Sequence, residues 1–141
     1  MKEGRKGIEG KRKLKEGRNR EGKEGNHCAA FISFNPRHYS VLKKVNIEGT
    51  ANVVNFCLTE GVKKLCYVSS IATLGKTTDG SFSSEETEFK PEEKNSVYAI
   101  TKHEAEMQVW RGTQEGLDAI IVHPGVIIGE GIWNSASGEL F

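Results

Sequence analysis

The sequence lacks the features that would place the chain in a membrane, outside the cell or on nucleic acid. No apolar run approaches the roughly 18–20 residues of a membrane span, and residues 1–25 contain no apolar core of a signal peptide. Cys28, Cys57 and Cys66 are odd in number, lack CxxC spacing and lie among apolar residues, which predicts buried thiols rather than a disulfide framework or a zinc site. The formal net charge of +1 favours neither nucleic acid nor an acidic surface as partner. We therefore expect a cytoplasmic protein without a membrane span.

The 141 residues suffice for one globular domain, but charge is unevenly distributed along them. Residues 1–25 hold ten Lys or Arg, five Glu and six Gly, and so carry +5. Such a segment cannot bury enough apolar area to offset the entropy of ordering, and its glycines interrupt a helix. We predict a disordered or weakly helical basic tail over 1–25 and a folded domain over 26–141. A nucleic-acid-binding arm is the alternative, which the interleaved glutamates and the absence of aromatic residues weaken.

The first part of the domain has the pattern strand, helix, strand. The run His27–Ile32 predicts the end of a buried strand. Apolar residues then recur at about the 3.6-residue period between Tyr39 and Leu58, which predicts a helix that Gly61 ends. Immediately afterwards, Leu65–Val68 predicts a second strand.

A second helix and a third strand follow. The polar stretch 75–95 predicts a long loop, and Ser96 can cap a helix that runs to about Gln114 and ends near Gly116. Ala119–Val122 predicts a strand that stops at Pro124. Alternating strands and helices predict an α/β fold with a doubly wound parallel sheet, whose ligands bind beyond the carboxyl ends of the strands.

Tyr98 and Lys102 lie four residues apart on the second predicted helix, so their side chains project from one face. A nearby ammonium lowers the pKa of a tyrosine from its ordinary value of about 10, which makes the phenol a useful acid–base group. A pair of solvent-facing residues is the alternative. Ser70 follows the second strand, where a hydroxyl can hold a substrate carbonyl. Ser69 and Thr73 compete for that role, and any of the three can instead be a turn hydroxyl, but we favour Ser70.

Five segments between Asn26 and Gly131 occur in an order and spacing typical of one family. They are His27-Cys28-Ala29-Ala30, Asn46-Ile47-Glu48-Gly49-Thr50, Tyr67-Val68-Ser69-Ser70, Tyr98-Ala99-Ile100-Thr101-Lys102, and His123-Pro124-Gly125 with Gly129. These segments resemble the motifs of the extended short-chain dehydrogenase/reductases, also called NAD-dependent epimerase/dehydratases, with histidine in place of the usual arginine in the last one. Nucleotide-sugar members usually have asparagine at the position of Val126, so the sequence is closer to the 3β-hydroxysteroid dehydrogenase and dihydroflavonol reductase branch.

The resemblance implies a Rossmann-type fold, NAD or NADP as cofactor, and hydride transfer at a carbonyl or secondary alcohol of a small-molecule substrate. It implies that Tyr98 exchanges a proton with the substrate oxygen, that Lys102 lowers the pKa of Tyr98 and binds the nicotinamide ribose, and that Ser70 polarises the carbonyl. Asn46 supports the site from the neighbouring helix. The implied cofactor-binding residues are Ala29, Ala30, Phe31, Asn46, Ser69, Tyr98, Lys102, Pro124, Gly125 and Val126.

The sequence departs from the family at both ends. Members begin with a strand, a Gly-x-x-Gly-x-x-Gly turn and a helix that bind the pyrophosphate. Gly4, Gly7 and Gly10 have this spacing, but no hydrophobic strand precedes them, so we interpret the match as coincidence. We expect a partial domain, truncated at both ends, whose exposed sheet edge a homo-oligomer or a complementing fragment could complete. A non-catalytic remnant without a complete cofactor site is the alternative function.

Overall fold

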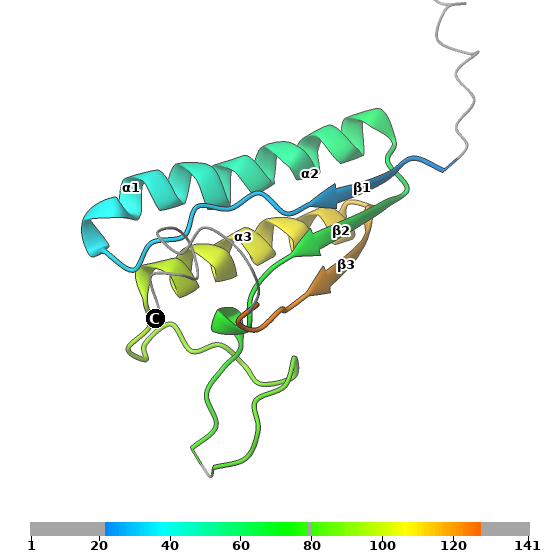
Figure 1. The fold of residues 1–141 in the computed structure, drawn as a ribbon. Helices are drawn as coiled ribbons and strands as arrows, with labels where there is room; N and C mark the ends of the chain where they lie inside the picture. The colour runs from blue at the N-terminus through cyan, green and yellow to red at the C-terminus, as the bar shows by residue number, and fades with distance from the viewer. Residues whose placement is uncertain (1–21, 79, 128–141) are drawn as a thin grey trace, which may run out of the picture.

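The computed structural model describes residues 22–78 and 80–127 of the chain. Its centre is a parallel three-stranded sheet in the order β1-β2-β3, with helical connections between successive strands (Figure 1). The strands are β1 (Glu24–His27), β2 (Lys64–Val68) and β3 (Asp118–Val122). The α/β fold with a parallel sheet is therefore confirmed, whereas the predicted tail lies mostly outside the described residues.

One long helical segment connects β1 to β2. After a 3-10 turn at Pro36–His38 it comprises α1 (Tyr39–Leu42), a π-helical stretch (Lys43–Glu48) and α2 (Gly49–Glu60). Gly61 ends it with a left-handed φ of 65°, a conformation that glycine adopts without steric cost. The helix and its end are where the sequence predicts them, but apolar periodicity did not indicate the π-helical stretch.

The second connection contains the helix that carries Tyr98 and Lys102. A 3-10 turn at Ile71–Thr73 follows β2, and after a long loop α3 spans Val97–Gln114. The Ser96 hydroxyl accepts a hydrogen bond of 3.1 Å from the amide of Ala99 and so caps this helix, as the sequence predicts.

The core lies between the sheet and the helices, which pack together on one face of β2. Its buried members are Val54 and Cys57 of α2, Leu65 and Tyr67 of β2, Ala105 and Val109 of α3, and Leu117. On β3, by contrast, Ile120 and Val122 are 47% and 40% exposed. Within the described residues, no helix is both long and apolar enough to cross a membrane.

Two expectations about the start of the domain are wrong. The first strand ends at His27 instead of running through the apolar residues after it, because pairing with Lys64–Tyr67 of β2 decides its extent. The strand also begins at Glu24, two residues before the expected start of the domain. Beyond the strand, Cys28 is exposed and Cys66 is half-buried, so only Cys57 has the buried position expected of all three thiols.

Gly112 permits the close packing of α3 against α2. A Cβ atom at this position would lie 2.6 Å from Cγ1 of Val54, a side chain with no exposed surface. We expect Gly112→Ala to destabilise the chain by about 1–3 kcal/mol through overpacking, although alanine is the better helix former. Urea unfolding measures this change. Gly49→Ala is the matched control, since its Cβ would meet only Lys44 O at 3.8 Å, and equal stability of the two variants would contradict the packing argument.

Candidate active site

A cavity of about 450 Å³ lies beyond the carboxyl ends of the three strands. Its walls come from four segments that are far apart in the sequence and meet at this edge of the sheet. They comprise Cys28, Ala30, Ile32 and Phe34 after β1; Val68, Ser69, Ser70, Ile71 and Ala72 at the end of β2 and after it; Tyr98 and Lys102 of α3; and Pro124, Gly125, Val126 and Ile127 after β3. The structure therefore brings together the strand ends that the sequence singles out for ligand binding.

Ser70 and Tyr98 lie beside each other in the lining of this cavity. Ser70 is the extended residue before the 3-10 turn, and its Oγ accepts a hydrogen bond of 3.2 Å from the amide of Ala72. Tyr98 is in the first turn of α3 and is 9% exposed, so the alternative of a solvent-facing residue is wrong. Burial raises the pKa of Tyr98, and a hydrogen bond with Ser70 opposes that rise. Tyr98 is therefore a neutral phenol near neutral pH.

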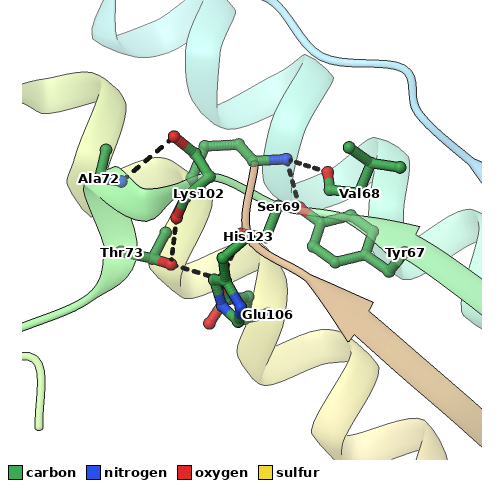
Figure 2. A network of polar contacts seen from close by, with 9 residues as sticks. Tyr67, Val68, Ser69, Ala72, Thr73, Lys102, Glu106 and His123 are labelled. Atoms are coloured by element: carbon green, nitrogen blue, oxygen red, sulfur yellow. Dashed lines mark hydrogen bonds and ion pairs between the residues drawn. The ribbon is translucent and has the colours of Figure 1, made fainter. Parts of the chain in front are cut away.

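Lys102 is 1% exposed, and its side chain reaches from α3 to the end of β2. Its Nζ donates hydrogen bonds to the Tyr67 hydroxyl at 2.8 Å and to the Val68 carbonyl at 2.9 Å (Figure 2). Burial lowers the pKa of Lys102 from 10.5 to about 8. The expectation that Lys102 lowers the pKa of Tyr98 is not met, because its ammonium is bonded to β2 instead. An ammonium has three donors, and the third finds no acceptor within residues 22–78 and 80–127.

Asn46 is buried in the π-helical stretch and holds the segment after β1 in place. Its Oδ1 accepts from the Phe31 amide at 2.8 Å, and its Nδ2 donates to the Phe31 carbonyl at 3.0 Å and to Thr101 Oγ1 at 3.3 Å. Both backbone groups of Phe31 are thus satisfied by one amide side chain. Asn46 does not line the cavity, but Phe31, which it holds, lies between the lining residues Ala30 and Ile32.

The hydroxyls of Ser69 and Thr73 are hydrogen-bonded within the protein and do not point to a substrate carbonyl. Both donate to Oε1 of Glu106, Thr73 at 2.6 Å, and His123 Nε2 lies 3.1 Å from the same oxygen (Figure 2). Of the three candidate hydroxyls, this leaves Ser70 beside Tyr98. Glu106 was not among the residues predicted from the sequence, although it lies one helical turn after Lys102, just as Lys102 lies one turn after Tyr98.

Most of the cofactor residues implied by the resemblance lie at the cavity. Ala30, Ser69, Tyr98, Lys102, Pro124, Gly125 and Val126 line it, whereas Ala29, Phe31 and Asn46 do not. The apolar residues Ile32, Phe34, Ile71 and Ile127 also line the cavity and were not among the predicted site residues. They are typical core or loop residues, so only the folded chain shows that they share a wall.

The buried ammonium of Lys102 makes stability depend on pH. In the unfolded chain Lys102 has its ordinary pKa of 10.5, and in the folded chain its pKa is about 8. Between pH 8 and 10.5 the unfolded state therefore binds more protons than the folded state. We expect stability to rise with pH from about 8 to 10, by at most about 1.4 kcal/mol per pH unit, relative to Lys102→Met. Urea unfolding of both proteins at several pH values measures this difference. Parallel stability curves for the two proteins would contradict the lowered pKa.

Known proteins are similar to this chain in sequence and in fold. The family model described as male sterility protein matches residues 26–140. A putative dihydroflavonol 4-reductase from Synechocystis sp. is 30% identical over 103 residues, which cover 73% of this chain and 30% of that protein. The 3beta-hydroxysteroid-dehydrogenase/decarboxylase isoform 1 of Arabidopsis thaliana is 33% identical over 88 residues, which cover 62% of this chain and 20% of that protein.

Solved structures also have the fold of this chain. The crystal structure of gox2253 is 34% identical and superimposes with a TM-score of 0.66, over 74% of this chain and 32% of that chain. Several other structures with this fold contain bound NAD. The chain spans less than a third of the length of the relatives named above. Since the family match covers β2, β3, both crossover helices and the cavity-lining segments, the chain belongs to the extended short-chain dehydrogenase/reductase family, in the group described as male sterility protein.

Proposed function

We propose that the cavity binds the nicotinamide end of NAD or NADP together with a carbonyl or secondary-alcohol substrate. Ser70, Tyr98 and Lys102 then assist hydride transfer between them. The observation that carries this proposal is that these three side chains, from the turn after β2 and from α3, line one cavity at the carboxyl edge of the sheet. Ligands of open α/β sheets bind at this edge.

The residues around the cavity fit a nicotinamide nucleoside. The third N–H of Lys102 is available to a ribose hydroxyl, and Ala30 and the segment Pro124–Val126 offer small or apolar surface for a flat ring. For Ser69 and Asn46 we propose an indirect part, because their polar atoms are bonded within the protein. Ala29 and Phe31 belong to the same segment as Ala30 but lie off the cavity. The bound cofactor supplies a carbon that gives or accepts the hydride.

The protonation state of Tyr98 favours carbonyl reduction. A neutral phenol donates its proton to the substrate oxygen while the hydride reaches the carbonyl carbon, and the products are an alcohol and a tyrosinate. Oxidation of the alcohol is the reverse, with the hydroxyl proton passing to the tyrosinate. The Ser70 hydroxyl lies beside Tyr98, where it can donate to the same carbonyl oxygen and polarise it.

The lining of the cavity favours an apolar substrate. Ile32, Phe34, Ile71, Val126 and Ile127 form much of the wall, and the charged or hydroxyl groups are confined to the Ser70, Tyr98 and Lys102 side. A hydrophobic ketone or alcohol can bury its body against the apolar wall with its oxygen at Tyr98. A nucleotide-sugar substrate would instead need polar partners for its hydroxyl groups.

The exposed side of the sheet favours an assembly. Ile120 and Val122 of β3 are accessible on the face away from α2 and α3, and parallel sheets are ordinarily covered on both faces. We propose that a second copy or a complementing chain covers this face. The proposed chemistry therefore needs to be tested together with the size of the protein in solution.

Titration with NADH and NADPH tests the cofactor proposal. We expect saturable enhancement of nicotinamide fluorescence, and at least about tenfold weaker binding by Lys102→Ala, since a charge-assisted hydrogen bond is lost. Tyr98→Phe is expected to bind the cofactor and to lose reduction of an apolar ketone. Lys63→Ala is the control, because Lys63 precedes β2 at the opposite edge of the sheet. A folded chain that binds neither dinucleotide would instead support the non-catalytic remnant.

A further inference from the structure

Glu106 is a buried carboxylate that the proposed chemistry does not use. It is 6% exposed and lies on α3, one turn beyond Lys102. Its Oε1 accepts hydrogen bonds from three groups: the hydroxyls of Ser69 and Thr73 and Nε2 of His123. A buried charge is costly unless several donors satisfy it, so this arrangement is a built polar site and not a chance contact.

The donors come from the two segments that flank the cavity. Ser69 and Thr73 enclose the turn that carries Ser70, and the Thr73 hydroxyl also lies 2.8 Å from the Ser70 carbonyl oxygen. Its single hydrogen is therefore placed between Glu106 and the backbone of Ser70. His123 immediately precedes Pro124 and Gly125 of the neighbouring segment, whose Pro124 carbonyl accepts a hydrogen bond of 3.1 Å from the Ile71 amide. One oxygen atom thus joins α3 to both segments (Figure 2).

The contact of His123 with Glu106 fixes the ring from one side. A carboxylate only accepts hydrogen bonds, so Nε2 carries a hydrogen, whereas Nδ1 is buried with no partner within the part of the chain that the structure describes. Glu106 is therefore the polar group that orients this ring. The chain after β3 reaches the cavity directly from this point.

The same carboxylate acts on Lys102. Burial lowers the pKa of Lys102, and the negative charge of Glu106 is the largest opposing influence, followed by Cys28. The other titratable groups beside the ammonium are His27 at the end of β1, Tyr67 on β2 and Tyr98 on α3. Glu106 differs from these groups because it is a buried carboxylate and so carries a negative charge. Its removal leaves the ammonium among aromatic rings, a histidine and the Cys28 thiol.

We propose that Glu106 is a positioning residue: its carboxylate holds the Ser70 turn and the His123-Pro124 segment beside the cavity, and its negative charge, one helical turn from Lys102, stabilises the buried ammonium. This inference rests on the proposed function, in which Ser70 and Lys102 serve the reaction. It assigns Glu106 no contact with substrate or cofactor.

Glu106→Gln tests the effect of the charge. The variant keeps the size of the side chain and removes its charge, so we expect the titration midpoint of Lys102 to fall by about one pH unit from its value near 8. NMR of the protein with isotope-labelled lysine side chains measures the midpoint, and the Lys102 signal is assigned by its absence from Lys102→Met. Glu104→Gln is the matched control, since Glu104 is a carboxylate of the same helix outside this network. The Lys102 midpoint in this control should equal that of the wild type. An unchanged midpoint in Glu106→Gln would overturn the electrostatic part of the proposal.

Glu106→Asp tests the holding role. It keeps the charge but withdraws the carboxylate by one methylene, so the Lys102 midpoint should stay near that of the wild type while the turn loosens. We expect the amides of Thr73 and Leu74, which bond Ser70 O and Ile71 O at 3.1 Å, to exchange their hydrogens about tenfold faster. Thr73→Val, which removes one donor and leaves Glu106 in place, serves the same purpose if Glu106→Asp does not fold. Unaltered exchange in a folded variant would show that Glu106 does not hold the turn.

Neither readout uses a cofactor. If the wild-type chain binds no dinucleotide while Glu106→Gln still shifts the Lys102 midpoint and Glu106→Asp still speeds exchange of the turn amides, the proposed function fails and the positioning role stands. If the chain binds NADH and neither quantity moves, the positioning role fails alone.

Discussion

The burial of the Lys102 ammonium is the constraint on which the rest of the site depends. A cation with 1% exposure is tolerable only if protein groups replace its hydration, and here the Tyr67 hydroxyl and the Val68 carbonyl do so. Both partners belong to the end of β2. The requirement therefore fixes α3 against that strand, and with α3 it fixes Tyr98 beside Ser70.

A second constraint shapes the wall that follows β1. This segment leaves the sheet after His27 and has no strand partner there, so its backbone groups must find other partners. The Asn46 side chain supplies an acceptor to the Phe31 amide and a donor to the Phe31 carbonyl, and its Nδ2 also donates to Thr101. It does so from a π-helical stretch, a rare geometry that is frequent at functional sites. The widened helix and the amide side chain together keep Ala30 and Ile32 at the cavity.

Two opposite charges lie buried along one face of α3. Lys102 points to the end of β2, and Glu106 points to the turn after β2 and to the chain after β3. Each is hydrogen-bonded to its own set of protein groups, and the carboxylate also favours the charge on the lysine. The site thus combines a cation stabilised at a distance by an anion with a neutral phenol whose pKa burial raises. The neutral phenol carries the proton that the proposed reduction requires, although its raised pKa makes it a weaker acid than a free tyrosine.

Local chemistry allowed much of the fold to be predicted from the sequence. Ser96 and Gly61 mark helix ends because a capping hydroxyl and a left-handed glycine are local requirements, and the runs around Leu65 and Ile120 indicate strands by their composition. The spacing of Tyr98 and Lys102 and the position of Ser70 after a strand suffice to nominate them. Their burial, and the failure of the solvent-facing alternative, could not be read from spacing alone.

The sequence by itself determined the alternation of strands and helices, the helix that carries Tyr98 and Lys102, and the strand ends that line the cavity. Only the tertiary structure decided where β1 ends, that Lys102 bonds β2 rather than acting on Tyr98, and that Ser69 and Thr73 serve Glu106. The physical reason is the range of the interactions. Caps and periodicity act within a few residues, whereas strand pairing, desolvation and the choice of a hydroxyl's acceptor depend on groups that meet only when the chain folds.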